Sequence, residues 1–147
     1  MPWGWDSAIK FQLEQLGIEA NVLPTDEKLS AIRELSNREY ASHVLRELRE
    51  LLDEDILIGE SFCARNVAEL TSLLKKIDKA VIKAPWSSSG RGVRYIDTMI
   101  DPAILNWANN VIKQQGSIMV EPYYNKVKDF GMEFIVNKDG VHYVGLS

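Results

Sequence analysis

A short segment rich in serine and glycine carries the residues best suited to chemistry in this sequence. Residues 83–96 read KAPWSSSGRGVRYI and lie between two apolar runs. Backbone amides, hydroxyls and an arginine suit the oxygens of a phosphate chain, and glycines let the backbone pass close to a ligand. The candidate anion-binding residues are therefore Ser87, Ser88, Ser89, Gly90, Arg91 and Gly92.

The charge around this segment supports an anionic ligand. Lys79, Lys83, Arg91 and Arg94 fall within residues 79–96, which contain no acidic residue, although the whole protein has a net charge of -4. The local field is therefore positive. A mobile hairpin loop with solvated charges is the alternative interpretation, because glycine-rich loops are weak signals by themselves.

Two general phosphate motifs do not fit the segment. SSSGRG lacks the GKS or GKT ending of a P-loop. Both the P-loop and the GxGxxG pattern also require a helix after the glycines, whereas GVRYI reads as a strand. The sequence predicts a loop that joins two strands, with Lys83 on the first strand, four residues before Ser87.

The first half of the chain predicts helices. Asp6 is placed to cap a short helix that ends before Gly17, and residues 29–35 continue a helical period. Ser36 with Glu39, and Asn66 with Glu69, have the spacing of capping boxes. Further helices are expected to begin at both places. The helix after Ser36 has an apolar stripe that needs a core to lie on, formed by Ala41, Val44, Leu45, Leu48, Leu51 and Leu52.

From residue 80 onward the pattern changes to short strands. AVIKA, GVRYI, SIMVE, GMEFIV and VHYVGL are rich in β-branched and aromatic residues, and NKDG between the last two is typical of a hairpin turn. Asp101 and Pro102 begin one helix among these strands. We therefore expect an α+β fold, with N-terminal helices followed by an antiparallel sheet with one covering helix. The expected division is 1–77 and 78–147.

Composition limits the class of protein. The 147 residues, 46% of them apolar, suit one globular core, and the negative net charge argues against nucleic acid. Cys63 is the single cysteine, and the sequence contains no signal peptide or long apolar run. His43 and His142 have no partner at metal-ligand spacing, so no metal site is predicted. We expect a reduced, soluble, cytoplasmic protein without nucleic-acid or membrane partners.

The order of motifs in residues 78–147 resembles the ATP-grasp superfamily of ATP-dependent carboxylate ligases. The resemblance rests on VIKAP, SSSGRGV, a helix, IMVEPYY and DFGMEF in that order. The resemblance implies that residues 78–147 form the small lobe that closes over the nucleotide. PWGWD and LSNREYASHVL are similar, more loosely, to the connecting region that precedes this lobe.

The resemblance assigns roles to individual residues. It implies that Lys83 contacts the nucleotide phosphates and that residues 87–92 form the flexible loop over them. Glu121 matches the carboxylate at the end of the third strand. The adjoining segment 122–124, which includes Tyr123, matches the hinge that binds adenine. A snorkelling lysine and solvated strand ends are the purely structural alternatives.

Three further residues are implied less directly. Asp129 matches the acid that accepts hydrogen bonds from the ribose hydroxyls. Glu133 has even spacing from Asp129 on the same expected strand, which would point it into the same cleft. Arg38 stands where relatives often place a basic residue that reaches a phosphate, although lysine is more usual there. A helix-surface arginine paired with a neighbouring acid is the alternative.

The implied function is the ATP-binding part of a carboxylate–amine or carboxylate–thiol ligase that acts through an acyl phosphate. The family's Mg²⁺ ligands lie on a second lobe, so we expect them outside this chain. We also expect the chain to be part of a longer protein, to be inactive alone and to self-associate through exposed sheet edges. The alternatives are a non-catalytic nucleotide-binding or regulatory module and a plain protein-interaction domain.

Overall fold

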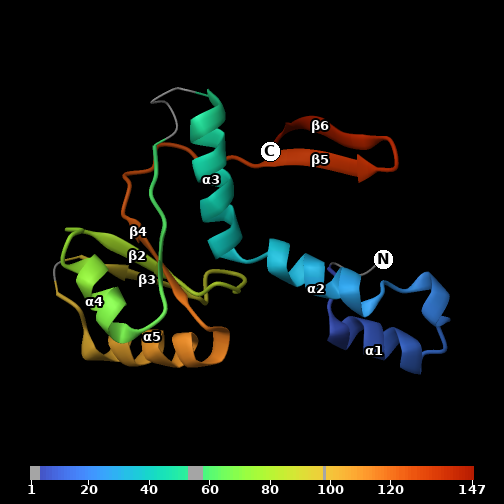
Figure 1. Ribbon diagram of the computed structural model, residues 1–147, viewed down its shortest axis with the longest axis horizontal. Helices are drawn as coiled ribbons and strands as arrows, with labels where there is room; N and C mark the ends of the chain where they lie inside the picture. Colours follow the sequence, from blue (N-terminus) through green and yellow to red (C-terminus); the bar gives the residue numbers. More distant parts are fainter. Residues whose placement is uncertain (1–3, 53–57, 98) are drawn as a thin grey trace.

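The computed structural model describes residues 4–52, 58–97 and 99–147 of the chain (Figure 1). It has a mixed α+β fold, as the sequence predicts. The helices are α1 (Ser7–Gln15), the 3-10 helix η1 (Ala20–Val22), α2 (Asp26–Leu35), α3 (Arg38–Leu52), α4 (Val67–Leu74) and α5 (Pro102–Gln115). The strands are β1 (Phe62–Ala64), β2 (Ala80–Lys83), β3 (Val93–Ile96), β4 (Ile118–Pro122), β5 (Met132–Asn137) and β6 (Gly140–Leu146).

Three of the helices begin at the predicted capping residues. The Asp6 carboxylate accepts a hydrogen bond from the Ile9 amide at 2.8 Å and caps α1. The Asn66 side chain caps α4 by accepting from the Glu69 amide at 2.8 Å. Asp101 caps α5, with proline at the first helical position. These starts are confirmed because each side chain satisfies an amide that has no partner inside its helix.

The predicted capping box at Ser36 is wrong. Ser36 is the C-cap residue that follows α2, and its hydroxyl donates to the Arg33 carbonyl at 2.8 Å. The side chain of Asn37 accepts instead from the Glu39 amide at 2.9 Å, and α3 begins at Arg38. The last carbonyls of α2 and the first amides of α3 both lack partners inside their helices. Ser36 therefore bonds to a carbonyl of α2, and Asn37 bonds to an amide of α3.

The strands form two antiparallel sheets where the sequence predicts one. The larger has the order β1–β4–β2–β3, and β5 and β6 form a separate hairpin (Figure 1). The predicted pairing across NKDG is confirmed, with Asn137 opposite Gly140. Sequence patterns missed β1, because its three residues are too few to establish an alternation.

The main core lies between the larger sheet and two helices, α4 and α5. Ala80, Ile82 and Ala84 alternate along β2 and its end toward this core. Leu70 of α4 and Val111 of α5 belong to the same cluster. The prediction of one covering helix is therefore wrong, since α4 packs on the sheet beside α5. Residues on both sides of the expected 77/78 division share this core.

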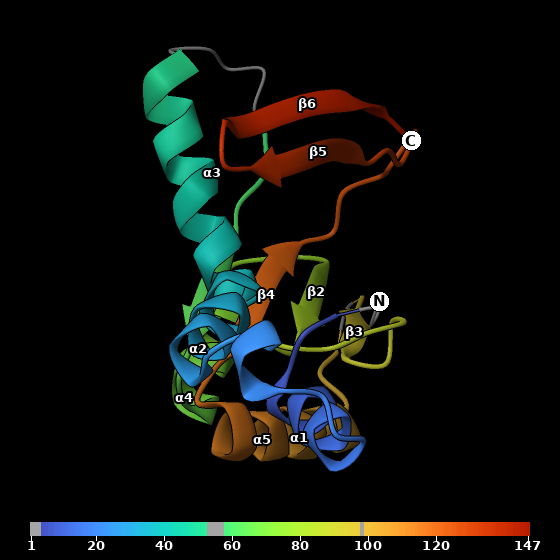
Figure 2. The same ribbon diagram turned by 90° about the vertical axis from the view of Figure 1, so that its right-hand side faces the viewer.

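The apolar stripe of α3 does not lie on a core within the described ranges 4–52, 58–97 and 99–147. Leu48 is 42% exposed and Leu51 is 78% exposed. The hairpin is similarly open, and its Phe134 and Tyr143 rings pack against each other with centroids 5.6 Å apart. Both ribbon views place α3 and the hairpin on the same side of the larger sheet (Figures 1 and 2).

In the part of the chain that the structure describes, no helix combines the length and apolar character needed to cross a membrane.

Candidate functional site

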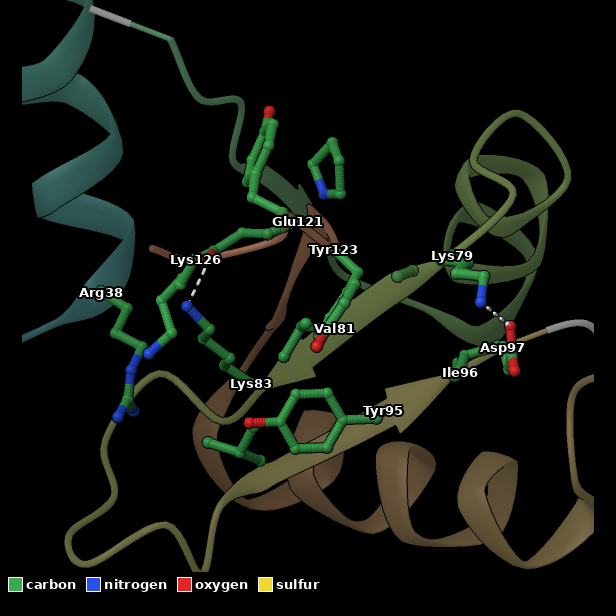
Figure 3. A pocket seen from close by; sticks show the side chains of 14 residues that line it. Arg38, Lys79, Val81, Lys83, Tyr95, Ile96, Asp97, Glu121, Tyr123 and Lys126 are labelled. Carbon is green, nitrogen blue, oxygen red and sulfur yellow. Dashed lines mark hydrogen bonds and ion pairs between the residues drawn. The ribbon is translucent and has the colours of Figure 1, made fainter. Parts of the chain in front are cut away.

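The face of the larger sheet opposite α4 and α5 lines a cavity of about 750 Å³. Val81, Lys83, Tyr95 and Glu121 line it from three neighbouring strands (Figure 3). Successive residues of a strand point to opposite faces, so the residues between Ala80, Ile82 and Ala84 turn toward the cavity. Along β2, residues that face the core thus alternate with residues that face the candidate site.

Lys83 and Glu121 form an ion pair within the cavity. The sheet register places Lys83 opposite Met119 and Val81 opposite Glu121, so the two charged residues are diagonal neighbours on adjacent strands. Diagonal neighbours lie within reach of long side chains. Their side chains are 28% and 25% exposed, and the Ser61 hydroxyl also donates to Glu121 at 3.4 Å. The predicted phosphate lysine is therefore held by the predicted carboxylate.

Arg38 enters the same cavity from the start of α3 (Figure 3). Its guanidinium donates to the Ala84 carbonyl at 2.6 Å and to the Ser87 hydroxyl at 2.9 Å. Its backbone amide donates to the Pro85 carbonyl at 3.1 Å. The structure thus brings Arg38, Lys83 and the base of the loop formed by residues 87–92, the Ser/Gly loop, together from distant parts of the sequence.

Two further lysines of the cavity also have acidic partners. Lys79 lies 2.8 Å from Asp97, and Lys126 lies 2.8 Å from Asp129. The hydrogen bond to Asp97 raises the pKa of Lys79, and the hydrogen bond to Asp129 raises the pKa of Lys126. The cavity therefore contains cations that are already paired with carboxylates.

Aromatic side chains line the part of the cavity near the predicted hinge. Tyr123 and Tyr95 meet edge to face, with ring centroids 6.0 Å apart, and Tyr124 also lines the cavity. Sequence reasoning missed Tyr95, Asp97 and Lys126. The alternation along β3 could have indicated that Tyr95 faces away from the core. The sheet register places it opposite Val81, which lines the same cavity.

The Ser/Gly loop has a fixed base and an exposed tip. The Ala84 amide donates to the Gly92 carbonyl at 2.8 Å, which closes the loop. At the tip, Ser89 and Gly90 have φ values of 53° and 70°, and both residues are exposed. Residues 87–92 are all described, and none of them lines the cavity in this conformation. Ser87 reaches its edge through the bond to Arg38.

Asp129 and Glu133 lie outside the set of residues that line the cavity. Asp129 pairs with Lys126, and Glu133 accepts from the Ser147 hydroxyl at 2.8 Å. The prediction that both acids lie on one strand is wrong, because β5 begins at Met132, after Asp129. The role of Asp129 toward a ribose and the place of Glu133 in a nucleotide cleft remain predictions.

The donor set of the cavity fits a phosphate-bearing nucleotide. Lys83 and Arg38 can donate to phosphate oxygens, and the tyrosine rings can pack against a base. A volume of about 750 Å³ is within the range of small-molecule sites. Among the described residues, no group of three or more His, Cys, Asp or Glu side chains could hold a metal ion.

Comparison of the chain with protein-family models and with curated proteins found no match.

Proposed function

We propose that the chain is the nucleotide-binding part of an ATP-grasp carboxylate–amine or carboxylate–thiol ligase. One observation carries the proposal: Lys83 and Arg38, from β2 and α3, converge on one cavity beside the Ser/Gly loop. Two cations on rigid elements next to a loop with an exposed tip suit the binding of a polyphosphate chain.

In this proposal, Lys83 and Arg38 hold the phosphate oxygens. Lys83 exchanges its Glu121 partner for phosphate, and Arg38 turns from Ser87 toward the ligand. The tip of the loop, residues 88–91, then closes over the phosphates and excludes water. Tyr95 and Tyr123 pack against the base, with the backbone of 122–124 at its edge.

The bound ATP supplies the phosphoryl group that converts a carboxylate substrate into an acyl phosphate, which an amine or thiol then displaces. The chain's own contribution is to orient the nucleotide and to neutralise its charge, which is the main protein contribution in phosphoryl transfer. We place Mg²⁺ ligands and the acceptor site in a longer protein that contains this chain, and we propose that this protein works in the cytoplasm.

The test is calorimetric titration with ATP, with and without Mg²⁺, on this chain and on any longer protein that contains it. Lys83→Met keeps most of the apolar stem and removes the charge. It should weaken ATP binding by about tenfold or more, since hydrogen bonds to charged groups contribute about 1.5–3 kcal/mol. Lys113→Met is the matched control, because Lys113 is exposed on α5, on the other side of the sheet.

Three outcomes separate the possibilities. ATP binding that weakens in Lys83→Met and not in Lys113→Met supports the proposal. Binding without ATP-dependent ligation in the longer protein would favour a non-catalytic nucleotide-binding module. Absence of ATP binding in both proteins would overturn the nucleotide proposal and return the loop to a solvated hairpin.

A further inference from the structure

One aromatic residue, Trp86, connects the base of the Ser/Gly loop to two helices, through its side chain to α2 and through its backbone amide to α5. The Trp86 indole N–H donates to the Arg33 carbonyl of α2 at 2.8 Å. Its backbone amide donates to the Gln115 side chain of α5 at 2.9 Å. The Arg33 guanidinium lies 4.4 Å from the centroid of the indole ring. Trp86 is therefore held from both sides, by the last turn of α2 and the last residue of α5.

These contacts bear directly on the position of Arg38. The Arg33 carbonyl is in the last turn of α2, where carbonyls lack a backbone partner inside the helix, and it accepts from the Ser36 hydroxyl as well as from Trp86. Only Ser36 and Asn37 separate the end of α2 from Arg38. Fixing Arg33 against Trp86 therefore also fixes the place where α3 begins.

The segment after β2 is held in turn by Arg38. The Arg38 side chain and amide together bond to Ala84, Pro85 and Ser87, the residues on either side of Trp86. Several hydrogen bonds thus hold the α2–α3 junction against residues 84–87. Lys83 directly precedes this segment, so the same hydrogen bonds fix its distance from Arg38.

We propose that Trp86, assisted by Gln115, is a positioning residue that holds Arg38 and the base of the Ser/Gly loop beside Lys83. The positioning itself requires no nucleotide. Its use for holding phosphate rests on the proposed function. Trp86 acts through its neighbours, since it does not line the cavity.

Two substitutions separate positioning from general packing. Trp86→Phe retains an aromatic ring under Arg33 and removes the indole donor. Gln115→Leu removes the acceptor of the Trp86 amide, whereas Gln115→Glu retains an acceptor at the same position. Gln114→Leu is the matched control, because Gln114 is the exposed neighbour of Gln115 on α5.

The primary measurement is hydrogen–deuterium exchange of residues 84–93 in the chain without nucleotide. Loss of one hydrogen bond predicts exchange about three- to tenfold faster in Trp86→Phe and Gln115→Leu. Gln115→Glu should restore protection, and Gln114→Leu should leave the segment unchanged. Thermal melting of each variant identifies any effect that arises from global unfolding.

The second measurement is ATP affinity, which should fall by a similar factor in Trp86→Phe. Equal exchange of residues 84–93 in Trp86→Phe, Gln115→Leu and the unaltered chain would overturn the positioning role. Faster exchange together with no ATP binding by the unaltered chain and by any longer protein that contains it would support the positioning role and overturn only the nucleotide proposal. Exchange that rises equally in Gln114→Leu would show a general effect of changes in α5 and would also overturn the positioning role.

Discussion

Lys83 of β2 and Glu121 of β4 pair across a diagonal of the sheet, on the face turned away from α4 and α5. Each is partly buried, so the attraction between them is less screened by solvent than in a surface pair. An anion that enters the cavity must compete with Glu121 for the lysine. This competition can be measured without knowing the natural ligand.

Glu121→Gln should strengthen the binding of inorganic tripolyphosphate, because Lys83 loses its charged partner. An increase of about three- to tenfold at low ionic strength is expected for the removal of one competing, partly buried charge. Calorimetric titration with tripolyphosphate provides the measurement. Glu69→Gln, on α4, is the control. Unchanged or weaker binding in Glu121→Gln would contradict the competition.

Gly92→Ala should destabilise the base of the loop. A Cβ at position 92 would overlap the Cβ and hydroxyl of Ser87 and would lie 3.1 Å from the Cβ of Ala84. Overpacking of this kind costs about 1–3 kcal/mol in the free energy of unfolding. Urea denaturation measures the change.

Ser87→Gly provides the matching test of that overlap, because it removes the atoms with which the new methyl would collide. The double variant should be more stable than the sum of the two single changes predicts, by about 1 kcal/mol. Strict additivity of the two substitutions would show that the Ser87 side chain is not the obstacle.

Cys63 should react slowly with iodoacetamide at neutral pH. Burial raises the pKa of its thiol, and the charge of Glu39 raises it further, against a lowering hydrogen bond from Ser117. The midpoint of the alkylation rate should therefore lie above the ordinary cysteine value of about 8.5. Glu39→Gln should lower that midpoint, whereas Glu47→Gln, farther along α3, should leave it unchanged.

The raised pKa of Cys63 also predicts how the stability of the chain changes with pH. Because the folded chain binds the Cys63 proton more tightly than the unfolded chain, the thiol's contribution to stability is present below the unfolded pKa. It is lost as the pH rises through the folded pKa. Between these two values the free energy of unfolding should fall less in Cys63→Ala than in the unaltered chain.

The hairpin should promote association between copies of the chain. In the described part of the chain, β5 and β6 pair only with each other, and an isolated two-stranded sheet is marginally stable in water. Val136 and Val141, which face each other in the register, are 73% and 67% exposed. Sedimentation velocity should show dimers at rising concentration through strand-edge pairing.

Val136→Lys should shift this equilibrium toward monomers, since an edge lysine opposes strand pairing. Val127→Lys is the control, because Val127 is 99% exposed and lies outside both sheets. A monomer at all concentrations in the unaltered chain would contradict the prediction.

Local signals in the sequence determined most of the secondary structure. Asp6, Asn66 and Asp101 cap helices where their spacing predicts, because a cap depends on residues only two or three positions apart. The strands after residue 80 and the turn before β6 follow from alternation and turn composition in the same way. The missed strand β1 and the shifted start of α3 depend on partners far along the chain or on a neighbouring helix end.

The sequence by itself also indicated which residues are candidates for binding an anion, through the composition of 83–96, and its alternation along β2 turns Lys83 away from the core. Only the tertiary structure decided which of them meet. The contact between Arg38 and Ser87 and the pair formed by Lys83 and Glu121 each join distant segments of the chain. Such contacts depend on sheet register and on how α2 and α3 dock, and neither is encoded in any local spacing.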